Sequence, residues 1–292
     1  MKILITGGSG FIGKNLIEYL TKRHEVLAPT HKELELLDDD AVRKYFKNHK
    51  IDVVIHAAVR PGHRNAKDPS NQLYINTRMF SNLIRNKDCF RKMIVLGSGL
   101  VYDTRYYLPK MKEDYFDTHV PEDEGGLSKY MIAKYIEKVD YITELRVFGI
   151  FGKYEDYAIR FISNAICKTL FDLPITIKQN RKFDYIYIDD LMPVIEHFIK
   201  DGSGCGAYNV CPDKSIELKP IAEKIKKISG KDLPIIIAND GMGPEYSGDN
   251  SRLKKEMPGL KFAPIDTSIK KLYDWYTERK DSINKELLLI DK

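Results

Sequence analysis

Two side chains that can move a proton lie one helical turn apart near the middle of the chain. Tyr130 and Lys134 stand at i and i+4, so a helix would present both on one face. A neighbouring ammonium favours the phenolate, which makes a tyrosine hydroxyl a usable acid or base near neutrality. Ser98 follows an apolar run and could hydrogen bond to a carbonyl or hydroxyl beside Tyr130. We therefore predict that Ser98, Tyr130 and Lys134 are catalytic, although a Tyr-x-x-x-Lys spacing alone is also common on protein surfaces.

A glycine-rich turn near the N-terminus is the second chemical feature. The apolar run Lys2–Thr6 leads directly into glycines at positions 7, 10 and 13, and a helix is predicted to follow. In a dinucleotide-binding turn the first glycine allows the tight bend, the second admits a pyrophosphate, and the third lets helix and strand approach closely. An ordinary glycine-rich turn is the alternative interpretation. The turn residues expected to bind the dinucleotide are Gly7, Ser9, Gly10, Phe11, Ile12 and Gly13.

The same turn nearly matches the P-loop of nucleoside triphosphatases. Asn15, however, stands where that motif needs a Ser or Thr hydroxyl to hold magnesium. The apolar run Val53–His56 also ends without an acidic residue that could bind the ion. The dinucleotide interpretation is therefore favoured, and no metal site is predicted.

The segment after the second apolar run indicates which dinucleotide binds. Thr30 stands where an acidic residue would accept hydrogen bonds from the adenosine ribose of NAD, whereas His31 and Lys32 could accommodate a 2′-phosphate. This favours NADP(H) over NAD(H), although Glu33 could still turn toward the ribose. The further residues expected to bind the cofactor are Thr30, His31, Lys32, Glu35, Leu36, His56, Ala57, Ala58, Asn76, Tyr130 and Lys134.

The elements that must position these residues follow from length and apolar pattern. A chain of 292 residues exceeds the usual size of one core, so we expect one large α/β domain with a smaller lobe. Val- and Ile-rich runs alternate with amphipathic segments through about residue 152, which predicts helices crossing a parallel sheet that is buried on both faces. The expected strands are Lys2–Thr6, Glu25–Ala28, Val53–Ala57, Met93–Gly97 and Tyr141–Val147, and the expected helices are Gly13–Lys22, Asp40–Lys47, Leu73–Arg85 and Lys129–Val139.

Composition excludes several other classes of protein. The chain has 47 Lys and Arg against 42 Asp and Glu, a net charge of +5, which is too small for an obvious nucleic-acid protein. Its four cysteines lack the Cys-x-x-Cys spacing and predict reduced thiols in a cytoplasmic protein. No apolar stretch is long enough to span a membrane, and no signal peptide is indicated, so we predict neither membrane insertion nor export.

Six segments together resemble the extended short-chain dehydrogenase/reductases, the NAD-dependent epimerase/dehydratase family. They are Thr6–Gly13, Asn76, Leu96–Ser98 with Tyr102, Tyr130 with Lys134, Leu145–Gly149 and Asp184–Asp190. This resemblance spans roughly residues 1–200 and implies a Rossmann doubly wound parallel sheet with a smaller α/β substrate-binding lobe. It also implies that Lys134 holds the nicotinamide ribose and that Asn76 supports the active site. The dinucleotide-binding domain would then comprise residues 1–152 and about 184–204, and the substrate lobe about 153–183 and 205–292.

Within that family the chain resembles in particular the GDP-L-fucose synthase-like nucleotide-sugar 4-ketoreductases. The similarity lies in Lys32–Asp38 and Arg91–Ser98. Leu100 stands where fucose synthases carry a cysteine, and Arg160 where they carry a histidine, so the resemblance supports ketone reduction without the added epimerisation steps. Gly149 also stands where many relatives have Asn.

The substrate-binding residues are expected in loops and in the second lobe. Arg160 and Lys168 are eight residues apart on the amphipathic stretch Ala158–Leu170 and could meet a diphosphate, or could equally be surface charges. The polar segment Tyr102–Gly126 should cover the sugar. The residues expected to contact the substrate are Ser98, Gly99, Leu100, Tyr102, Arg160 and Lys168.

The function expected from these features is NAD(P)H-dependent reduction of a 4-keto nucleotide sugar, in deoxysugar or surface-polysaccharide precursor synthesis. Tyr130 would donate the proton, Ser98 would position the ketone oxygen and Lys134 would tune Tyr130. Two alternatives stay open: a nucleotide-sugar 4-epimerase with tightly bound NAD, and a catalytically silent nucleotide-sensing or scaffold protein. The resemblance also implies a homodimer that pairs the helices over Leu73–Arg85 and Lys129–Val139.

Overall fold

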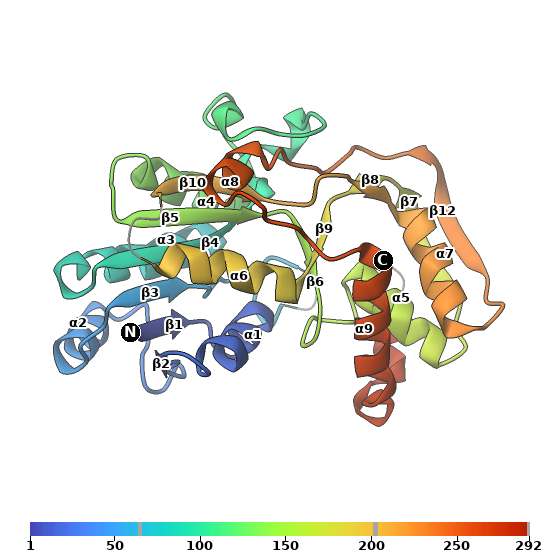
Figure 1. Ribbon diagram of the computed structural model, residues 1–292, viewed down its shortest axis with the longest axis horizontal. Helices are drawn as coiled ribbons and strands as arrows, with labels where there is room; N and C mark the ends of the chain where they lie inside the picture. Colours follow the sequence, from blue (N-terminus) through green and yellow to red (C-terminus); the bar gives the residue numbers. More distant parts are fainter. Residues whose placement is uncertain (64–65, 201–203, 291–292) are drawn as a thin grey trace.

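A parallel sheet forms the centre of the larger domain. The computed structural model describes residues 1–63, 66–200 and 204–290, and within them six parallel strands are ordered β10-β5-β4-β3-β1-β2 (Figure 1). These strands are β1 (Lys2–Thr6), β2 (Glu25–Leu27), β3 (Val53–His56), β4 (Lys92–Ser98), β5 (Ile142–Val147) and β10 (Gly206–Val210). The chain order reverses between β1 and β3, and ligands of doubly wound sheets bind at the carboxyl ends of the strands beside such a switch. The predicted α/β fold class is confirmed.

Helices cover both faces of this sheet, which explains its continuous apolar strands. Ile3 and Ile5 point toward α1 (Phe11–Leu20) and α6 (Ile188–Ile199). Leu4, between them, points into the core on the opposite face. The helices on that face are α2 (Asp39–Asn48), α3 (Gln72–Ile84) and α4 (Glu124–Ile136). Successive residues of each central strand are therefore buried on opposite sides.

Helix α4 begins five residues before the predicted start at Lys129. Gly125 and Gly126 disfavour helix, which is why the apolar pattern placed the start after them. The carboxylate of Asp123 accepts a hydrogen bond from the Gly126 backbone N–H at 2.7 Å and caps the first turn. Both glycines and Lys129 therefore belong to one continuous helix.

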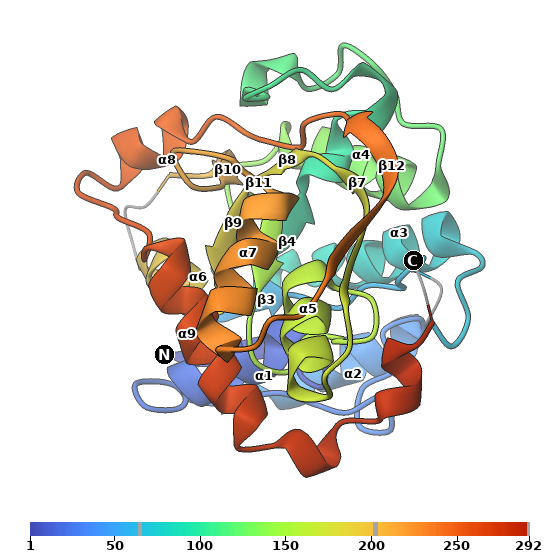
Figure 2. The same cartoon turned by 90° about the vertical axis from the view of Figure 1, so that its right-hand side faces the viewer.

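The smaller lobe packs beside the carboxyl ends of the sheet, at the right of Figure 1 and facing the viewer in Figure 2. Its helices α5, α7 and α9 pack on one another and on a two-stranded parallel ribbon of β7 and β12. Two short strand pairs, β6 with β9 and β8 with β11, join the lobe to the sheet domain. The elements are α5 (Phe161–Leu170), α7 (Leu218–Ser229), α8 (Ser251–Glu256), α9 (Ile265–Thr277), β6 (Gly149–Phe151), β7 (Ile175–Asn180), β8 (Lys182–Phe183), β9 (Tyr185–Tyr187), β11 (Ile216–Glu217) and β12 (Ile235–Met242).

The chain crosses between the two parts more than once. Helix α6 covers the central sheet. Strand β10 then pairs with β5 in that same sheet, so residues of the sheet extend beyond the boundary expected near residue 204.

Among the described residues, no helix has both the length and the apolar character needed to cross a membrane.

Gly149 marks the tightest crossing between the two parts. A Cβ atom at this position would lie 2.0 Å from the carbonyl oxygen of Asp184, because β6 and β9 run side by side here. No side chain fits in that space. The contact gives a physical reason for glycine at this position.

Replacing Gly149 with Ala should destabilise the protein by about 1–3 kcal/mol, because β6 and β9 must separate to admit the methyl group. Chemical denaturation of wild type and variant measures this difference. Gly243→Ala is the matched control, since its added Cβ would meet only the flexible ends of Gln179 and Arg181, at 3.0 and 3.2 Å. Equal stability of Gly149→Ala and wild type would contradict the assigned contact.

Candidate active site

The glycine turn between β1 and α1 has the geometry of a dinucleotide cradle. Gly7 has φ +75°, and a Cβ there would lie 2.6 Å from the backbone nitrogen of Ala58. A Cβ at Gly13 would lie 2.1 Å from the Gly7 carbonyl oxygen. Helix α1 begins directly after Gly10 without a side-chain cap, so its first backbone N–H groups are available to an anion. These residues fit a dinucleotide pyrophosphate.

Asn15, the residue that departs from the P-loop motif, has a structural role. Its side-chain amide donates hydrogen bonds to the carbonyl oxygens of Phe11 and Lys153, at 2.9 and 3.0 Å. The residue is buried, and it ties α1 to the segment after β6.

The predicted adenosine end of the site lies beyond β2. Glu33 accepts hydrogen bonds from the backbone N–H and the hydroxyl of Thr30, at 2.7 and 2.9 Å, and these bonds lower the pKa of Glu33. His31 and Glu35 are exposed and lie 3.5 Å apart. Leu36 differs from the others, because its side chain is buried in the core between the sheet and α2.

A pocket continues from the glycine turn along the carboxyl ends of β3 and β4. It is lined by His56, Ala58, Val59, Asn76, Val95, Leu96, Gly97, Ser128, Lys129, Ile132 and Glu144. Three of the predicted cofactor residues are therefore brought together here. The pocket adjoins the cradle through Ala58, the residue against which Gly7 turns.

Two predicted cofactor residues organise the walls of this pocket. Nδ1 of His56 lies 2.8 Å from the Thr6 hydroxyl, and burial lowers the pKa of His56 to about 4, with the charge of Lys129 contributing. Asn76 accepts a hydrogen bond from the Arg60 backbone N–H at 2.7 Å and donates one to the Ser128 hydroxyl at 3.4 Å. The imidazole is thus neutral near pH 7, and Asn76 fixes α3 to α4.

Lys129 faces the pocket and is absent from the predicted site. Within α4 it shares a face with Gly125, four residues earlier, and with Ile132, three residues later. Burial lowers the pKa of Lys129, while the negative charge of Glu144 opposes the shift. The sequence pattern does not indicate Lys129, because Gly125 stands four residues earlier and carries no reactive side chain.

The predicted catalytic pair lies on a neighbouring face of α4. Both Tyr130 and Lys134 donate hydrogen bonds to the carboxylate of Asp117, the lysine at 2.8 Å. Lys134 also lies 2.9 Å from Glu137. The Tyr130 ring packs against Phe116, with centroids 5.4 Å apart. The structure therefore places Tyr130 and Lys134 side by side, as predicted, but does not bring them among the pocket-lining residues.

Asp117 also changes the expected electrostatics of Tyr130. The hydrogen bond to this carboxylate raises the pKa of Tyr130, and the opposing effect of Lys134 is smaller. The pKa of Lys134 is itself raised, chiefly by its hydrogen bond to Asp117. Lys134 therefore lowers the pKa of Tyr130 as expected, but the Asp117 carboxylate that bonds both side chains outweighs this effect.

A buried ion pair supports the pocket from behind. Arg146 donates a hydrogen bond from Nε to Glu144 at 2.8 Å, and both side chains are 2% exposed. Arg146 also donates to the Tyr102 hydroxyl at 2.9 Å, which in turn donates to Asn209 on β10 at 2.7 Å. A Cβ at Gly97 would lie 2.6 Å from the Glu144 carboxylate. The network therefore joins β5, β10 and the segment after β4 behind the pocket.

The residues after β4 have different surroundings. Ser98 ends β4 next to the pocket-lining Gly97, and its hydroxyl accepts a hydrogen bond from the Leu100 N–H at 3.3 Å. Gly99 is buried, and its carbonyl accepts a hydrogen bond from Tyr107, whereas Leu100 is 38% exposed. The prediction that Tyr102 binds substrate is corrected, because Tyr102 is buried and its hydroxyl is hydrogen bonded to Arg146 and Asn209.

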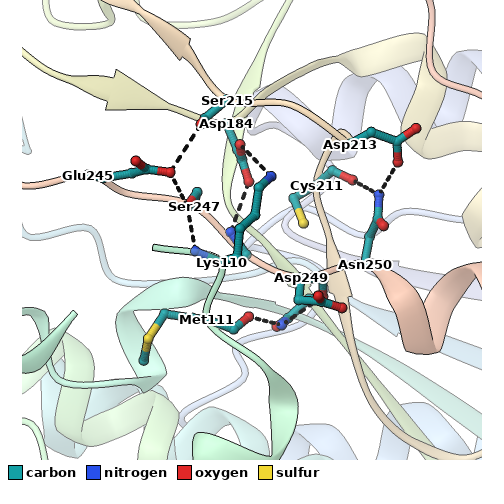
Figure 3. Close-up of polar contacts among 12 residues, drawn as sticks. Lys110, Met111, Asp184, Cys211, Asp213, Ser215, Glu245, Ser247, Asp249 and Asn250 are labelled. Atoms are coloured by element: carbon teal, nitrogen blue, oxygen red, sulfur yellow. Dashed lines mark hydrogen bonds and ion pairs between the residues drawn. The ribbon is translucent and has the colours of Figure 1, made fainter. Parts of the chain in front are cut away.

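The segment that follows, residues 99–123, is fastened to the smaller lobe (Figure 3). The Lys110 backbone N–H donates to the Ser247 hydroxyl at 2.8 Å. Its ammonium lies 3.7 Å from Asp184, which accepts a hydrogen bond from the Gly248 N–H at 2.9 Å. Burial raises the pKa of Asp184 to about 6. This segment therefore bridges the sheet domain and the lobe.

The predicted diphosphate pair is not assembled in the structure. Arg160 is exposed and immediately precedes α5, so it is outside the helix. Lys168 is 4% exposed, and its ammonium donates a hydrogen bond to the Thr176 hydroxyl at 2.7 Å. Lys168 is therefore a buried lysine that joins α5 to β7.

The cradle, the switch point and the pocket together define a dinucleotide-dependent enzyme of the doubly wound α/β class. Comparison with known families gives the same result: the NAD dependent epimerase/dehydratase family matches residues 3–211. The chain belongs to this family. The resemblance to extended short-chain dehydrogenase/reductases is thereby confirmed.

Individual relatives were found by sequence and by structure. GDP-L-colitose synthase of Yersinia pseudotuberculosis is 31% identical over 231 residues, 69% of this chain and 73% of that protein. GDP-mannoheptose C4 reductase of Campylobacter jejuni, solved with NADP bound, has a TM-score of 0.81 at 24% identity and covers 94% of this chain and 98% of its own. The Bordetella bronchiseptica enzyme WbmG, solved with NAD, has a TM-score of 0.80 at 20% identity over 96% and 95%. The two structural likenesses establish the fold.

Removing one member of the buried ion pair should be costly. Arg146→Met leaves the Glu144 charge buried without its partner, and we expect a loss of about 3–5 kcal/mol of unfolding free energy. The double variant with Glu144→Gln should regain part of this loss, because neither charge then remains. Urea denaturation measures both values.

Arg43→Met is the control for this experiment. Arg43 pairs with Asp39 on the exposed surface of α2, where such a pair contributes at most about 1 kcal/mol. A loss for Arg146→Met no larger than that for Arg43→Met would contradict the role given to the buried pair.

Proposed function

We propose that this enzyme uses NAD(P)H to reduce a 4-keto nucleotide sugar, in the synthesis of deoxysugar or surface-polysaccharide precursors. The observation that carries this proposal is the pocket that continues from the dinucleotide cradle along the carboxyl ends of β3 and β4. Such a crevice is where doubly wound folds bind their ligands. The names of two relatives, a GDP-L-colitose synthase and a GDP-mannoheptose C4 reductase, support a GDP-linked sugar as the substrate class.

The chain's own residues would hold the two reactants. The backbone N–H groups after Gly10 would face the pyrophosphate, and Ala58 and Asn76 would border the nicotinamide end. The nicotinamide supplies the hydride when bound. Ser98, at the end of β4, would orient the ketone oxygen, and the segment over residues 99–123 would limit access of water to the sugar.

NADP(H) is proposed over NAD(H). One oxygen of the Glu33 carboxylate, Oε2, accepts two hydrogen bonds from Thr30, which hold the side chain against its own turn. His31 and Lys32 are exposed beside it and could meet a 2′-phosphate.

The test is a panel of GDP-, UDP-, CDP- and dTDP-linked 4-ketosugars, with consumption of NADPH and of NADH followed by absorbance. We expect turnover with a GDP-linked ketone, and a lower KM for NADPH than for NADH. Mass spectrometry of nucleotide bound to the purified protein accompanies the assay. Isomerisation of a nucleotide sugar without net coenzyme consumption would replace the proposal with an epimerase, and coenzyme binding without turnover on any substrate would replace it with a binding protein.

We also propose a homodimer formed through α3 and α4. These helices pack on one another and each exposes a large apolar side chain, Tyr74 at 65% and Met131 at 52%. A second copy of the pair would bury both in a four-helix interface.

Met131→Glu should convert the dimer into a monomer, because a charge would be buried at the interface. Size-exclusion chromatography with light scattering measures the mass. Met242→Glu is the matched control, since Met242 is equally exposed, at 52%, but lies on β12 of the smaller lobe. A wild-type monomer, or a dimer unaffected by Met131→Glu, would contradict this interface.

A further inference from the structure

The pocket holds few groups that can give up a proton, and this inference rests on the reduction proposed above. Among the described residues that line it, Lys129 is the one cation. Gly125 lies one helical turn before Lys129 on the same face of α4. Glycine has no hydroxyl or phenol that could donate a proton beside the lysine.

The other titratable groups of the pocket are committed elsewhere. His56 is buried with Nδ1 beside the Thr6 hydroxyl, and its pKa of about 4 leaves it neutral and without a proton to spare near pH 7. Glu144 accepts a hydrogen bond from Nε of Arg146 at 2.8 Å. Both side chains are therefore already engaged by other groups of the protein.

Tyr130 follows Lys129 in the sequence, but it is not among the residues that line the pocket. One residue advances a helix by about 100°, so Tyr130 projects from a different face than Lys129. Its hydroxyl donates to Asp117, and its ring lies against Phe116. To reach a ketone in the pocket, Tyr130 would have to leave both contacts.

We propose that Lys129 is the catalytic acid of this enzyme. In the reduction, the carbonyl carbon gains the hydride supplied by the coenzyme, and the C=O π bond breaks. The oxygen takes a proton from the Lys129 ammonium as the N–H bond breaks, giving an alcohol and a neutral amine. The amine then regains a proton from water before the next turnover.

The surroundings of Lys129 suit this role. Burial makes the ammonium a stronger acid than an exposed lysine, while the negative charge of Glu144 on β5 opposes this shift. His56, on β3, faces the same space and adds no charge in its neutral form. The ammonium form is required, so turnover should fall as pH rises through the pKa of Lys129, at a lower pH than for an ordinary lysine.

The decisive variants are Lys129→Arg and Lys129→Met. Arginine keeps the positive charge but does not release its proton at neutral pH. We therefore expect Lys129→Arg to bind NADPH with nearly unchanged affinity, measured by fluorescence, and to lose roughly 10²–10⁴-fold in kcat. Lys129→Met should lose as much in kcat and bind NADPH more weakly. Lys138→Arg, the same change at an exposed position outside the pocket, is the control and should keep wild-type values.

A second measurement of the acidity of Lys129 does not depend on catalytic turnover. Reductive ¹³C-methylation of the lysines, followed by NMR titration, should show one resonance with a lowered pKa that is missing in Lys129→Arg. Glu144→Gln should lower that pKa further, because the stabilising carboxylate charge is gone. An ordinary pKa for this resonance would contradict the electrostatic part of the proposal.

The outcomes separate this inference from the proposed function. Retained kcat in Lys129→Arg, or loss of kcat in Tyr130→Phe with Lys129→Arg still active, would overturn the assignment of Lys129 while leaving the reductase in place. Absence of turnover by the wild-type protein on every ketosugar would overturn the reductase itself. The NMR titration would still report the acidity of Lys129 in that case.

Discussion

The buried pair of Glu144 and Arg146 sets the geometry around it. Two charges removed from water must be matched by close hydrogen bonds, or the fold loses several kcal/mol. The guanidinium satisfies this need with Glu144 on one side and the Tyr102 hydroxyl on the other. Because Tyr102 also bonds Asn209 of β10, the last strand of the sheet and the segment above the site are fixed by the same residue. The same hydrogen-bond network therefore fixes both the pocket wall and the segment over residues 99–123.

The strands and most helices of the sheet domain could be predicted because their physics is local. A parallel strand buried on both faces is a continuous apolar run, and Val53–His56 is one of these. Helix α4 was harder. Gly125 and Gly126 weaken its helical signal, yet the Asp123 cap and packing against α3 and the sheet carry the helix through them. In α4, tertiary contacts therefore outweigh the low helix propensity of the two glycines.

The same comparison explains why the sequence pattern did not show which face of that helix borders the pocket. Spacing alone puts Tyr130 and Lys134 together, and the structure does so, but spacing cannot say which side of a helix meets the pocket. Both sides of α4 carry apolar residues, because one side packs on the sheet and the other lies beneath Phe116. Lys168 and Tyr102 were misjudged for a related reason. Their polar ends suggested contact with substrate, whereas Thr176 and Asn209 satisfy them inside the protein.

Gly149 restricts how this chain can diverge. The carbonyl of Asp184 occupies the volume that any side chain at position 149 would need, so the amino acid there cannot drift while β9 stays where it is. A step to Asn would require the backbone of β9 to move first. A side chain at position 149 therefore cannot be accommodated without a change in the second strand of the pair.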